Sequence, residues 1–179
     1  MSREKLMTAA AINTTIDALY EKIRSALPAD KPIGVIGIRT RGETLARRFV
    51  ERLAADNPDL DVKLGVLDIT FYRDDLSRRK GLPLVRATEI DFDLDDRFVV
   101  LVDDVLQTGR SIRAALDALH DFGRPGVIRL AVLLDRGGRE VPIAADWAGK
   151  TLSVAPGQRI DIQLRENDGQ EGAYVISEA

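Results

Sequence analysis

The stretch VVLVDDVLQTGRS, residues 99–111, joins an uninterrupted apolar run to two adjacent carboxylates and a polar, glycine-containing turn. The apolar run predicts a strand buried on both faces, because a half-exposed strand would alternate apolar and polar residues. Apolar side chains then recur at helical spacing from Ile112 to Leu119, so a helix is expected to begin near residue 112. Asp103 and Asp104 are expected to end the strand, where an open parallel sheet meets its ligands.

The same alternation of strand and helix extends along the chain on both sides of this stretch. Apolar periodicity predicts helices over residues 9–27 and around Leu45, Phe49 and Leu53. Short apolar runs rich in β-branched residues predict strands over residues 33–39, 62–72 and 127–135. This order indicates an α/β fold, with a mostly parallel central sheet and helices on both faces. Later pieces between turn signals predict peripheral or edge strands at residues 151–154, 159–164 and 173–177.

Composition limits the class of protein. With 179 residues, 45% of them hydrophobic and 31% charged, the chain is expected to form a single domain over residues 1–179. It contains no cysteine, which excludes disulfides and thiolate chemistry, and no apolar run approaches the roughly 18–20 residues that cross a bilayer. A cytoplasmic protein without membrane contact is expected. The net charge of −3 gives no general attraction to nucleic acid, so an RNA-binding role would require a local basic patch.

The two carboxylates and the turn after them predict a site for a sugar phosphate. Asp103 and Asp104 point to opposite sides of an extended backbone, yet together they can address a vicinal diol or a Mg²⁺ ion. The turn leads into a helix N-terminus, where unpaired N–H groups attract an anion and a glycine lets the backbone approach it. Strand-end acids and capping hydroxyls also occur without any ligand. The joint pattern is more specific and matches the spacing of a ribose 5-phosphate.

VVLVDDVLQTGRS resembles the phosphoribosyl pyrophosphate (PRPP) signature of the type I phosphoribosyltransferases. Three further segments, GIRTRG, YRDDLS and DRGGREVPI, make the chain similar, from about residue 33 to about 165, to one subfamily. That subfamily comprises the bifunctional pyrimidine operon attenuation regulators and uracil phosphoribosyltransferases. The resemblance implies a type I phosphoribosyltransferase fold, in which a small peripheral β hood accompanies the central sheet. It also implies Mg²⁺, PRPP and uracil or UMP as ligands, and assembly into dimers or larger homo-oligomers.

The resemblance also implies roles for individual residues. Asp103 and Asp104 would hold the ribose hydroxyls, directly or through Mg²⁺, and are expected to be catalytic together with Arg41. The PRPP-binding motif would comprise Val99, Val100, Leu101, Val102, Asp103, Asp104, Val105, Leu106, Gln107, Thr108, Gly109, Arg110 and Ser111. The pyrophosphate loop would be Arg39, Thr40, Arg41 and Gly42; a flexible loop would contribute Arg73, Arg78, Arg79 and Lys80; and the base would lie against Leu134, Asp135, Arg136 and Gly137.

The implied reaction joins uracil N1 to C1 of PRPP and releases pyrophosphate and UMP. Gln107 favours a pyrimidine, because purine-using relatives carry an aspartate at this position and an amide cannot act as an ionised base. Two alternatives remain: a nucleotide-sensing RNA-binding regulator with weak catalysis, and a phosphoribosyltransferase for another base.

The resemblance also implies binding to the mRNA leader of a pyrimidine operon, but this chain departs from the subfamily's pattern at residues linked to that role. The subfamily's first helix carries an Arg and a His beside a Thr, whereas this chain has Asp17 and Glu21 there, and Gly138 stands where His is frequent. These changes remove potential phosphate contacts. A basic patch could still form from Arg139, Lys150, Arg47 and Arg48.

Overall fold

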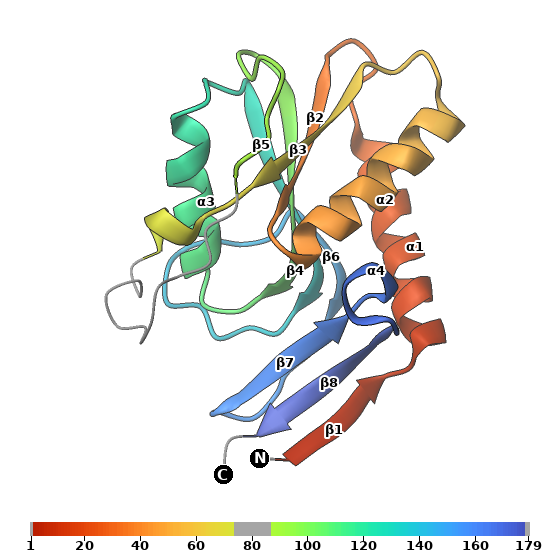
Figure 1. Ribbon diagram of the computed structural model, residues 1–179, viewed down its shortest axis with the longest axis vertical. Helices are drawn as coiled ribbons and strands as arrows, with labels where there is room; N and C mark the ends of the chain where they lie inside the picture. Colours follow the sequence, from red (N-terminus) through yellow and green to blue (C-terminus); the bar gives the residue numbers. More distant parts are fainter. Residues whose placement is uncertain (1, 74–86, 178–179) are drawn as a thin grey trace.

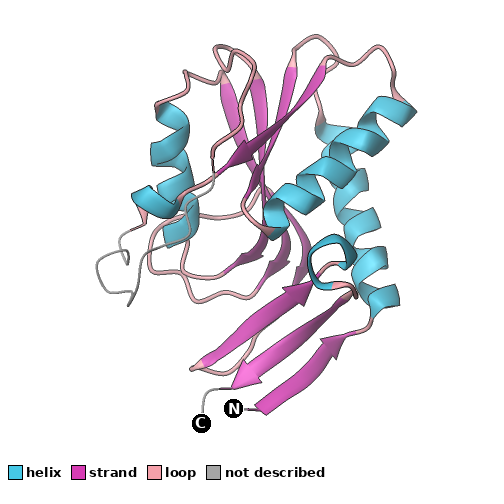
Figure 2. Ribbon diagram, viewed as in Figure 1, coloured by secondary structure: helices cyan, strands magenta, loops and turns pink. Residues whose placement is uncertain are grey.

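The computed structural model describes residues 2–73 and 87–177, and its centre is a five-stranded parallel sheet (Figures 1 and 2). The strand order is β3-β2-β4-β5-β6, and every neighbouring pair is parallel. The bounds are β2 Ile33–Ile38, β3 Val62–Leu67, β4 Phe98–Leu106, β5 Val127–Asp135 and β6 Trp147–Thr151. β4 is the middle strand, which explains why Val99 to Val102 are all fully buried.

Helices cover both faces of the sheet and separate the core into two apolar clusters. On one face, α1 (Ala9–Ala26) and α2 (Arg41–Asp56) pack through residues such as Leu19, Ile23 and Phe49. On the other face, α3 (Arg110–His120) packs through Ile112 and Leu119, close to the short 3₁₀ turn η1 (Thr70–Tyr72). The two clusters hold the sheet rigid between them, so its carboxyl edge is a fixed platform for side chains.

A second, antiparallel sheet lies beyond the carboxyl edge of the central sheet (Figure 1). Its order is β1-β8-β7, with β1 Ser2–Met7, β7 Gln158–Gln163 and β8 Gly172–Ser177. The short helix α4 (Arg165–Asp168) connects β7 to β8. We call these three strands and α4 the hood. The expected fold class is therefore confirmed: a type I phosphoribosyltransferase fold with helices on both sheet faces and a small peripheral hood.

Three predicted strand boundaries were wrong, and strand pairing explains each. The strand that Asp103 and Asp104 were expected to end continues to Leu106, because its ladder with β5 persists to Asp135 beyond the apolar run. The strand predicted over 62–72 stops at Leu67, opposite the last residue of β2, and η1 follows it.

The piece predicted at 151–154 contributes only Thr151 to a strand, since β6 lies earlier along the chain and ends opposite Asp135. β1 was not predicted at all. Within the described residues no helix is long and apolar enough to span a membrane.

Candidate active site

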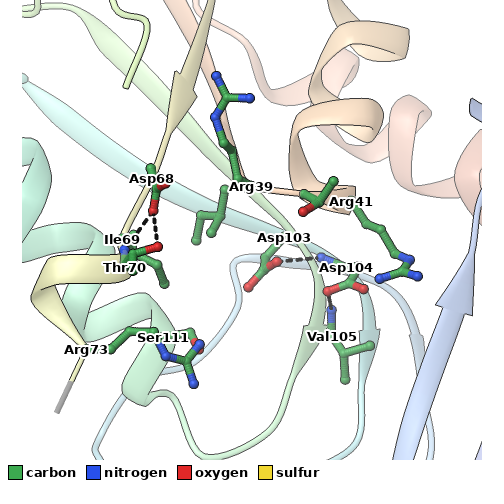
Figure 3. A pocket seen from close by; sticks show the side chains of 12 residues that line it. Arg39, Arg41, Asp68, Ile69, Thr70, Arg73, Asp103, Asp104, Val105 and Ser111 are labelled. Atoms are coloured by element: carbon green, nitrogen blue, oxygen red, sulfur yellow. Dashed lines mark hydrogen bonds between the residues drawn. The ribbon is translucent and has the colours of Figure 1, made fainter. Parts of the chain in front are cut away.

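The two adjacent carboxylates lie near the C-terminal end of β4 and face opposite sides of the strand. The Asp104 N–H donates to Asp103 Oδ1 at 2.9 Å, and the Val105 N–H donates to Asp104 Oδ1 at 2.8 Å. The positive charge of Arg73 favours the ionised form of Asp103, and the positive charge of Arg41 favours the ionised form of Asp104. Both carboxylates nevertheless line one cavity, because the cavity extends around the end of β4 (Figure 3).

Burial disfavours the charged forms of both carboxyls. It raises the pKa of Asp103 well above the ordinary value of 3.8, and the neighbouring Asp104 raises it further. Burial also raises the pKa of Asp104, although the positive charge of Arg41 opposes this. A cation or a donor hydroxyl that contacts the pair would favour its ionised form.

The segment from Arg39 to Gly42, which comprises the turn after β2 and the start of α2, approaches β4 unusually closely. A Cβ on Gly42 would lie 2.4 Å from the Val102 carbonyl oxygen, so only glycine fits at this position. The Arg39–Thr40 peptide bond in the same segment is cis. Arg39, Thr40 and Arg41 border the cavity that contains the two carboxylates.

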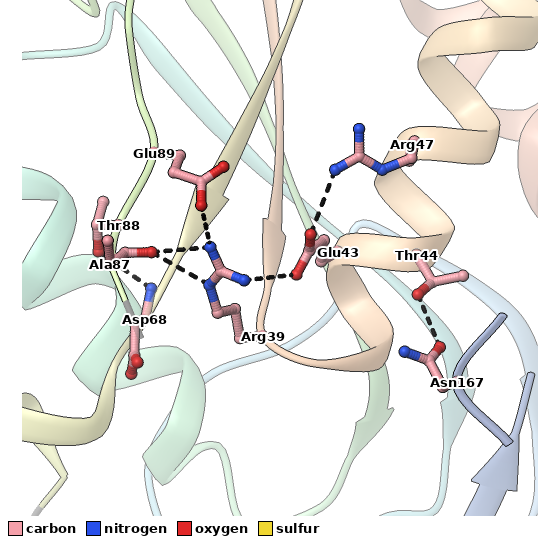
Figure 4. A network of polar contacts seen from close by, with 9 residues as sticks. All are labelled: Arg39, Glu43, Thr44, Arg47, Asp68, Ala87, Thr88, Glu89 and Asn167. Carbon is pink, nitrogen blue, oxygen red and sulfur yellow. Dashed lines mark hydrogen bonds and ion pairs between the residues drawn. The ribbon is translucent and has the colours of Figure 1, made fainter. Parts of the chain in front are cut away.

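Two arginines of this segment differ in their contacts. The Arg39 guanidinium is bound by carboxylates and a carbonyl: Nη1 donates to Glu43 at 3.1 Å, Nη2 to Glu89 at 2.6 Å, and Nε and Nη2 to the Ala87 carbonyl (Figure 4). Arg39 therefore borders the cavity mainly as a structural residue. Arg41 donates instead to Asp168 of the hood, from Nη2 at 2.8 Å and from Nε at 3.3 Å.

The cavity has a volume of about 390 Å³ and draws its walls from four parts of the chain. Three of them are the turn after β2 with the start of α2, the end of β4 and the start of α3. The fourth is the segment after β3, which contributes Asp68, Ile69, Thr70 and Arg73. Figure 3 shows Arg41 and Asp104 on one side of Asp103, with Arg73 and Ser111 on the other. Charged and hydroxyl groups thus converge at the carboxyl edge of the sheet, where a polar, anionic ligand can be bound.

A second cavity of about 260 Å³ shares Arg73, Asp103, Val105 and Ser111 with the first. Its floor is the segment Leu106 to Ile112, in which Gly109 has a φ of 86° that favours glycine. α3 begins directly after this glycine, and its first turn borders the cavity through Ser111 and Ile112. The sequence-predicted motif therefore contributes to both cavities, while Val99 to Val102 are buried strand residues.

The end of β5 and the loop after it carry two charged side chains, Asp135 and Arg136, which differ in their contacts. Asp135 accepts from Arg139 Nη2 at 2.6 Å and from the Gly137 N–H at 3.0 Å; burial opposes its ionisation, but these contacts prevail and lower its pKa. Arg136 is only 8% exposed, and its Nη1 donates to the Gln158 carbonyl at 2.6 Å. Its buried Nε has no hydrogen-bond partner among the described residues. This side chain lines the second cavity, whereas Leu134 is fully buried in the sheet.

Some predicted residues lie outside the described part of the chain. These are Arg78, Arg79 and Lys80 of the expected flexible loop. Arg73, the fourth residue of that group, lies after η1 and lines both cavities.

Other residues near the site were not predicted from the sequence. Asp68 follows β3 much as Asp103 follows the apolar part of β4, and this parallel was hidden by extending the predicted strand to residue 72. Arg159 and Ile160 reach the second cavity from β7 of the hood, and Asp168 holds Arg41. No local sequence pattern predicts that these three residues lie near the site, because their positions depend on how the hood folds over the sheet.

The two carboxylates suit a hard divalent cation that brings further ligands with it. Among the described residues no group of three or more His, Cys, Asp or Glu side chains could hold a metal ion. Asp103 and Asp104 alone supply two oxygen-bearing groups, and Mg²⁺ commonly takes one or two carboxylates and completes its shell with water and substrate phosphates. The residues therefore fit Mg²⁺ bound together with a phosphorylated ligand.

Comparisons with known proteins agree with this geometry. The family described as "Phosphoribosyl transferase domain" matches residues 2–162. The chain is 47% identical over 165 residues to "Bifunctional protein PyrR" of Elusimicrobium minutum, with 92% of each chain covered. It is 46% identical to the protein of the same name from a Roseiflexus species, with 98% of this chain and 96% of the relative covered.

Solved structures support the same fold at much lower identity. A hypoxanthine-guanine phosphoribosyltransferase of Bacillus anthracis superposes with a TM-score of 0.70 at 16% identity, covering 97% of this chain and 98% of that one. The hypoxanthine phosphoribosyltransferase of Trypanosoma cruzi also gives 0.70, at 18% identity, covering 98% and 95%. The similarity of sequence over nearly the whole length, together with the shared fold, shows that the chain belongs to the phosphoribosyltransferase family and, within it, to the group of proteins named bifunctional protein PyrR.

Proposed function

We propose that the protein, as one domain spanning residues 1–179, is a uracil phosphoribosyltransferase that converts uracil and PRPP into UMP and pyrophosphate. The main support is the convergence of Asp103, Asp104, Arg41, Arg73 and Ser111 on one cavity that continues into a second. The relatives' name, which includes the word bifunctional, is compatible with this activity and with a further role.

In this proposal the first cavity takes the ribose and pyrophosphate of PRPP. Asp103 and Asp104 accept hydrogen bonds from the ribose hydroxyls, and the loop containing Thr40 and Arg41 binds the pyrophosphate. Positive charge grows on the ribose ring as the bond from C1 to the pyrophosphate oxygen breaks, and the two carboxylates stabilise that charge. Arg41 and Arg73 stabilise the negative charge on the leaving pyrophosphate. When bound, Mg²⁺ would neutralise PRPP oxygens and share in this task.

The second cavity takes the 5-phosphate and the base. Gln107 to Ser111 form the phosphate cradle at the N-terminus of α3, where unpaired N–H groups favour an anion. The base lies near the end of β5, beside Arg136, whose buried Nε lacks an acceptor among the described residues. A buried donor without a partner is costly, and a carbonyl oxygen of uracil would satisfy it. This supports uracil, which presents two carbonyl oxygens, over bases that present amino groups there.

Nucleotide formation tests the proposal directly. Purified protein is mixed with PRPP, Mg²⁺ and, separately, uracil, orotate, hypoxanthine or guanine, and the products are separated by chromatography. UMP should form from uracil far faster than any other nucleotide forms from its base. Rapid IMP or GMP formation would favour the alternative of another base, and absence of UMP at every Mg²⁺ concentration would contradict the proposal. Light scattering of the same sample tests the proposed dimer or larger assembly.

A second proposed role is UMP-dependent binding to the mRNA leader of a pyrimidine operon. The relatives' word bifunctional favours it, but the local charges give it less support. Arg47 contacts Glu43 at 3.3 Å, Arg48 contacts Glu166 at 2.6 Å, and Arg139 contacts Asp135 at 2.6 Å. Three of the four cations of the expected patch are thus partly neutralised.

Filter binding to such a leader tests this role, with and without UMP and at several salt concentrations. UMP-dependent retention that weakens as salt rises would support it, because phosphate contacts release counterions. A protein that makes UMP but retains no leader RNA would be an enzyme alone.

A further inference from the structure

One face of α2 is joined to the hood by three side chains spaced three and four residues apart. Arg41 contacts Asp168, Thr44 Oγ1 donates to Asn167 Oδ1 at 2.7 Å, and Arg48 contacts Glu166 and Glu171 at 2.6 and 2.5 Å. We call these contacts the α2–hood seam. Figure 4 shows its middle contact, Thr44 with Asn167. The spacing places all three residues on one helix face.

The seam's first contact differs from the other two because Arg41 also borders the larger cavity. Asp168 engages one edge of the Arg41 guanidinium, through Nε at 3.3 Å and Nη2 at 2.8 Å. This two-point contact fixes both the position and the plane of the group. Nη1, on the opposite edge, has no hydrogen-bond partner among the described residues.

Asp168 is itself held in place by the hood backbone. Its Oδ2 accepts from the Leu164 N–H at 2.9 Å, and its side chain is only 18% exposed. Asp161 of β7 lies 3.9 Å from Arg41 Nη2 and adds a weaker attraction in the same direction. The hood thus supplies a preformed acceptor for an arginine at the start of α2.

We propose that Asp168 is a positioning residue for pyrophosphate: it fixes Arg41 so that the free Nη1 edge meets the pyrophosphate of PRPP. This inference rests on the proposed function and assigns the hood a part in binding the leaving group. The charge of Asp168 offsets part of the charge of Arg41. An arginine held on one edge nevertheless loses less conformational freedom when the other edge binds an anion, and we infer that this gain outweighs the partial neutralisation.

The test compares Asp168→Asn with Glu166→Gln in the full-length protein. The asparagine keeps an oxygen for the Leu164 N–H but loses the charge that holds Arg41. Glu166→Gln weakens the neighbouring ion pair of the same helix α4 without touching Arg41. Calorimetry measures binding of Mg²⁺-pyrophosphate, and steady-state kinetics measures KM for PRPP and for uracil separately.

Asp168→Asn should weaken pyrophosphate binding and raise KM for PRPP by about tenfold, the order expected when a charged hydrogen bond is lost indirectly, while KM for uracil stays near the wild-type value. Asp168→Glu should recover part of the loss. In an Arg41→Ala background the Asp168→Asn change should have no further effect, because Asp168 acts through Arg41.

Two results separate the possible failures. If Asp168→Asn binds pyrophosphate as tightly as Glu166→Gln does, Asp168 is structural and the inference is overturned. If the wild-type protein makes no UMP yet Asp168→Asn still weakens pyrophosphate binding, the proposed function fails and the role of Asp168 stands.

Discussion

Two groups of acidic residues, one at the end of β4 and one in the α2–hood seam, differ in their burial and in their hydrogen-bond partners. At the end of β4, Asp103 is buried and Asp104 is partly buried, and each accepts a hydrogen bond from a backbone N–H group. In the α2–hood seam, Glu166 and Glu171 both contact Arg48. Burial raises the pKa of Asp103, whereas the hydrogen bond from Arg48 lowers the pKa of Glu166.

In the proposed function, this difference separates carboxylates that bind a ligand from carboxylates that stabilise the fold. A fully paired acid contributes to stability and has little affinity left for anything else. An acid that is buried without a salt-bridging cation costs stability and is ready to bind a hydroxyl or a metal ion. Substitutions at the end of β4 should therefore affect activity more than stability, and substitutions in the seam should affect stability more than activity.

The largest expected effect is on catalysis. Asp104→Asn keeps the size of the side chain and an acceptor oxygen for the Val105 N–H, but it removes the charge that we propose contacts the ribose. The rate of UMP formation should fall by roughly 10²–10³-fold, as when one transition-state contact is lost. Stopped-time assays of UMP measure this, and circular dichroism should show an unchanged fold. A wild-type rate would mean that the carboxylate is structural.

The next effect is on stability and comes from the seam. Arg48→Ala leaves Glu171, whose side chain is only 6% exposed, without its cation. Breaking a fully buried ion pair in this way costs about 3–5 kcal/mol, so this partly buried pair should cost less, about 2 kcal/mol, and the half-exposed Glu166 adds little. Urea denaturation should show a clearly lower midpoint, while the folded variant keeps KM for uracil near the wild-type value. Unchanged stability would remove the contrast with β4.

A smaller effect of opposite sign is expected at Asp103. Because its pKa is raised in the folded state, its contribution to stability is present at low pH and is lost as the pH rises through that pKa. Asp103→Asn cannot ionise, so it avoids this loss and should melt a few degrees higher than the wild type at pH 8, with little difference at pH 4. Calorimetric melting at both pH values measures this. A variant that melts lower at pH 8 would contradict a cost of burying this charge.

The smallest effect is on stability in the seam, and its pH dependence is opposite to that of Asp103. The pKa of Glu166 is lowered from 4.5, so its stabilisation is present above that value and is lost as the pH falls. Its carboxylate is half exposed, so Glu166→Gln should cost less than about 1 kcal/mol at pH 7, and the cost should vanish in acid. Urea titrations at pH 7 and near pH 3 give the two values. Equal costs at both pH values would show that packing, not charge, is what the substitution removes.

The sequence was most informative where chemistry and burial coincide along a few adjacent residues. The middle strand, the two carboxylates and the turn into α3 are contiguous, so one stretch predicted them together. Their placement around cavities agrees with that reading, while their roles in binding PRPP remain predictions. The loop at residues 39–42 was found in the same way, although only Arg41 among its arginines keeps an unpaired edge within the described residues.

Features that depend on pairing between distant segments could not be predicted. Strand ends follow the neighbouring strand and not the apolar run, which is why β3 and β4 were given wrong limits. The charged, exposed residues of β1 have no apolar pattern, and they form a strand only because β8 offers a free edge. The partner of Arg41 lies 127 residues away, so no local spacing could reveal it.

The position of β8 between β1 and β7 has a consequence for biosynthesis. Ser2 pairs with Ser177, so β1 has no partner until β8, which lies far along the chain from it, has been made. The central sheet can fold from neighbouring segments meanwhile, because its strands follow one another closely along the chain. A nascent chain that ends before β8 would thus have most of its core but an incomplete hood, and β1 would remain an unpaired edge open to other chains.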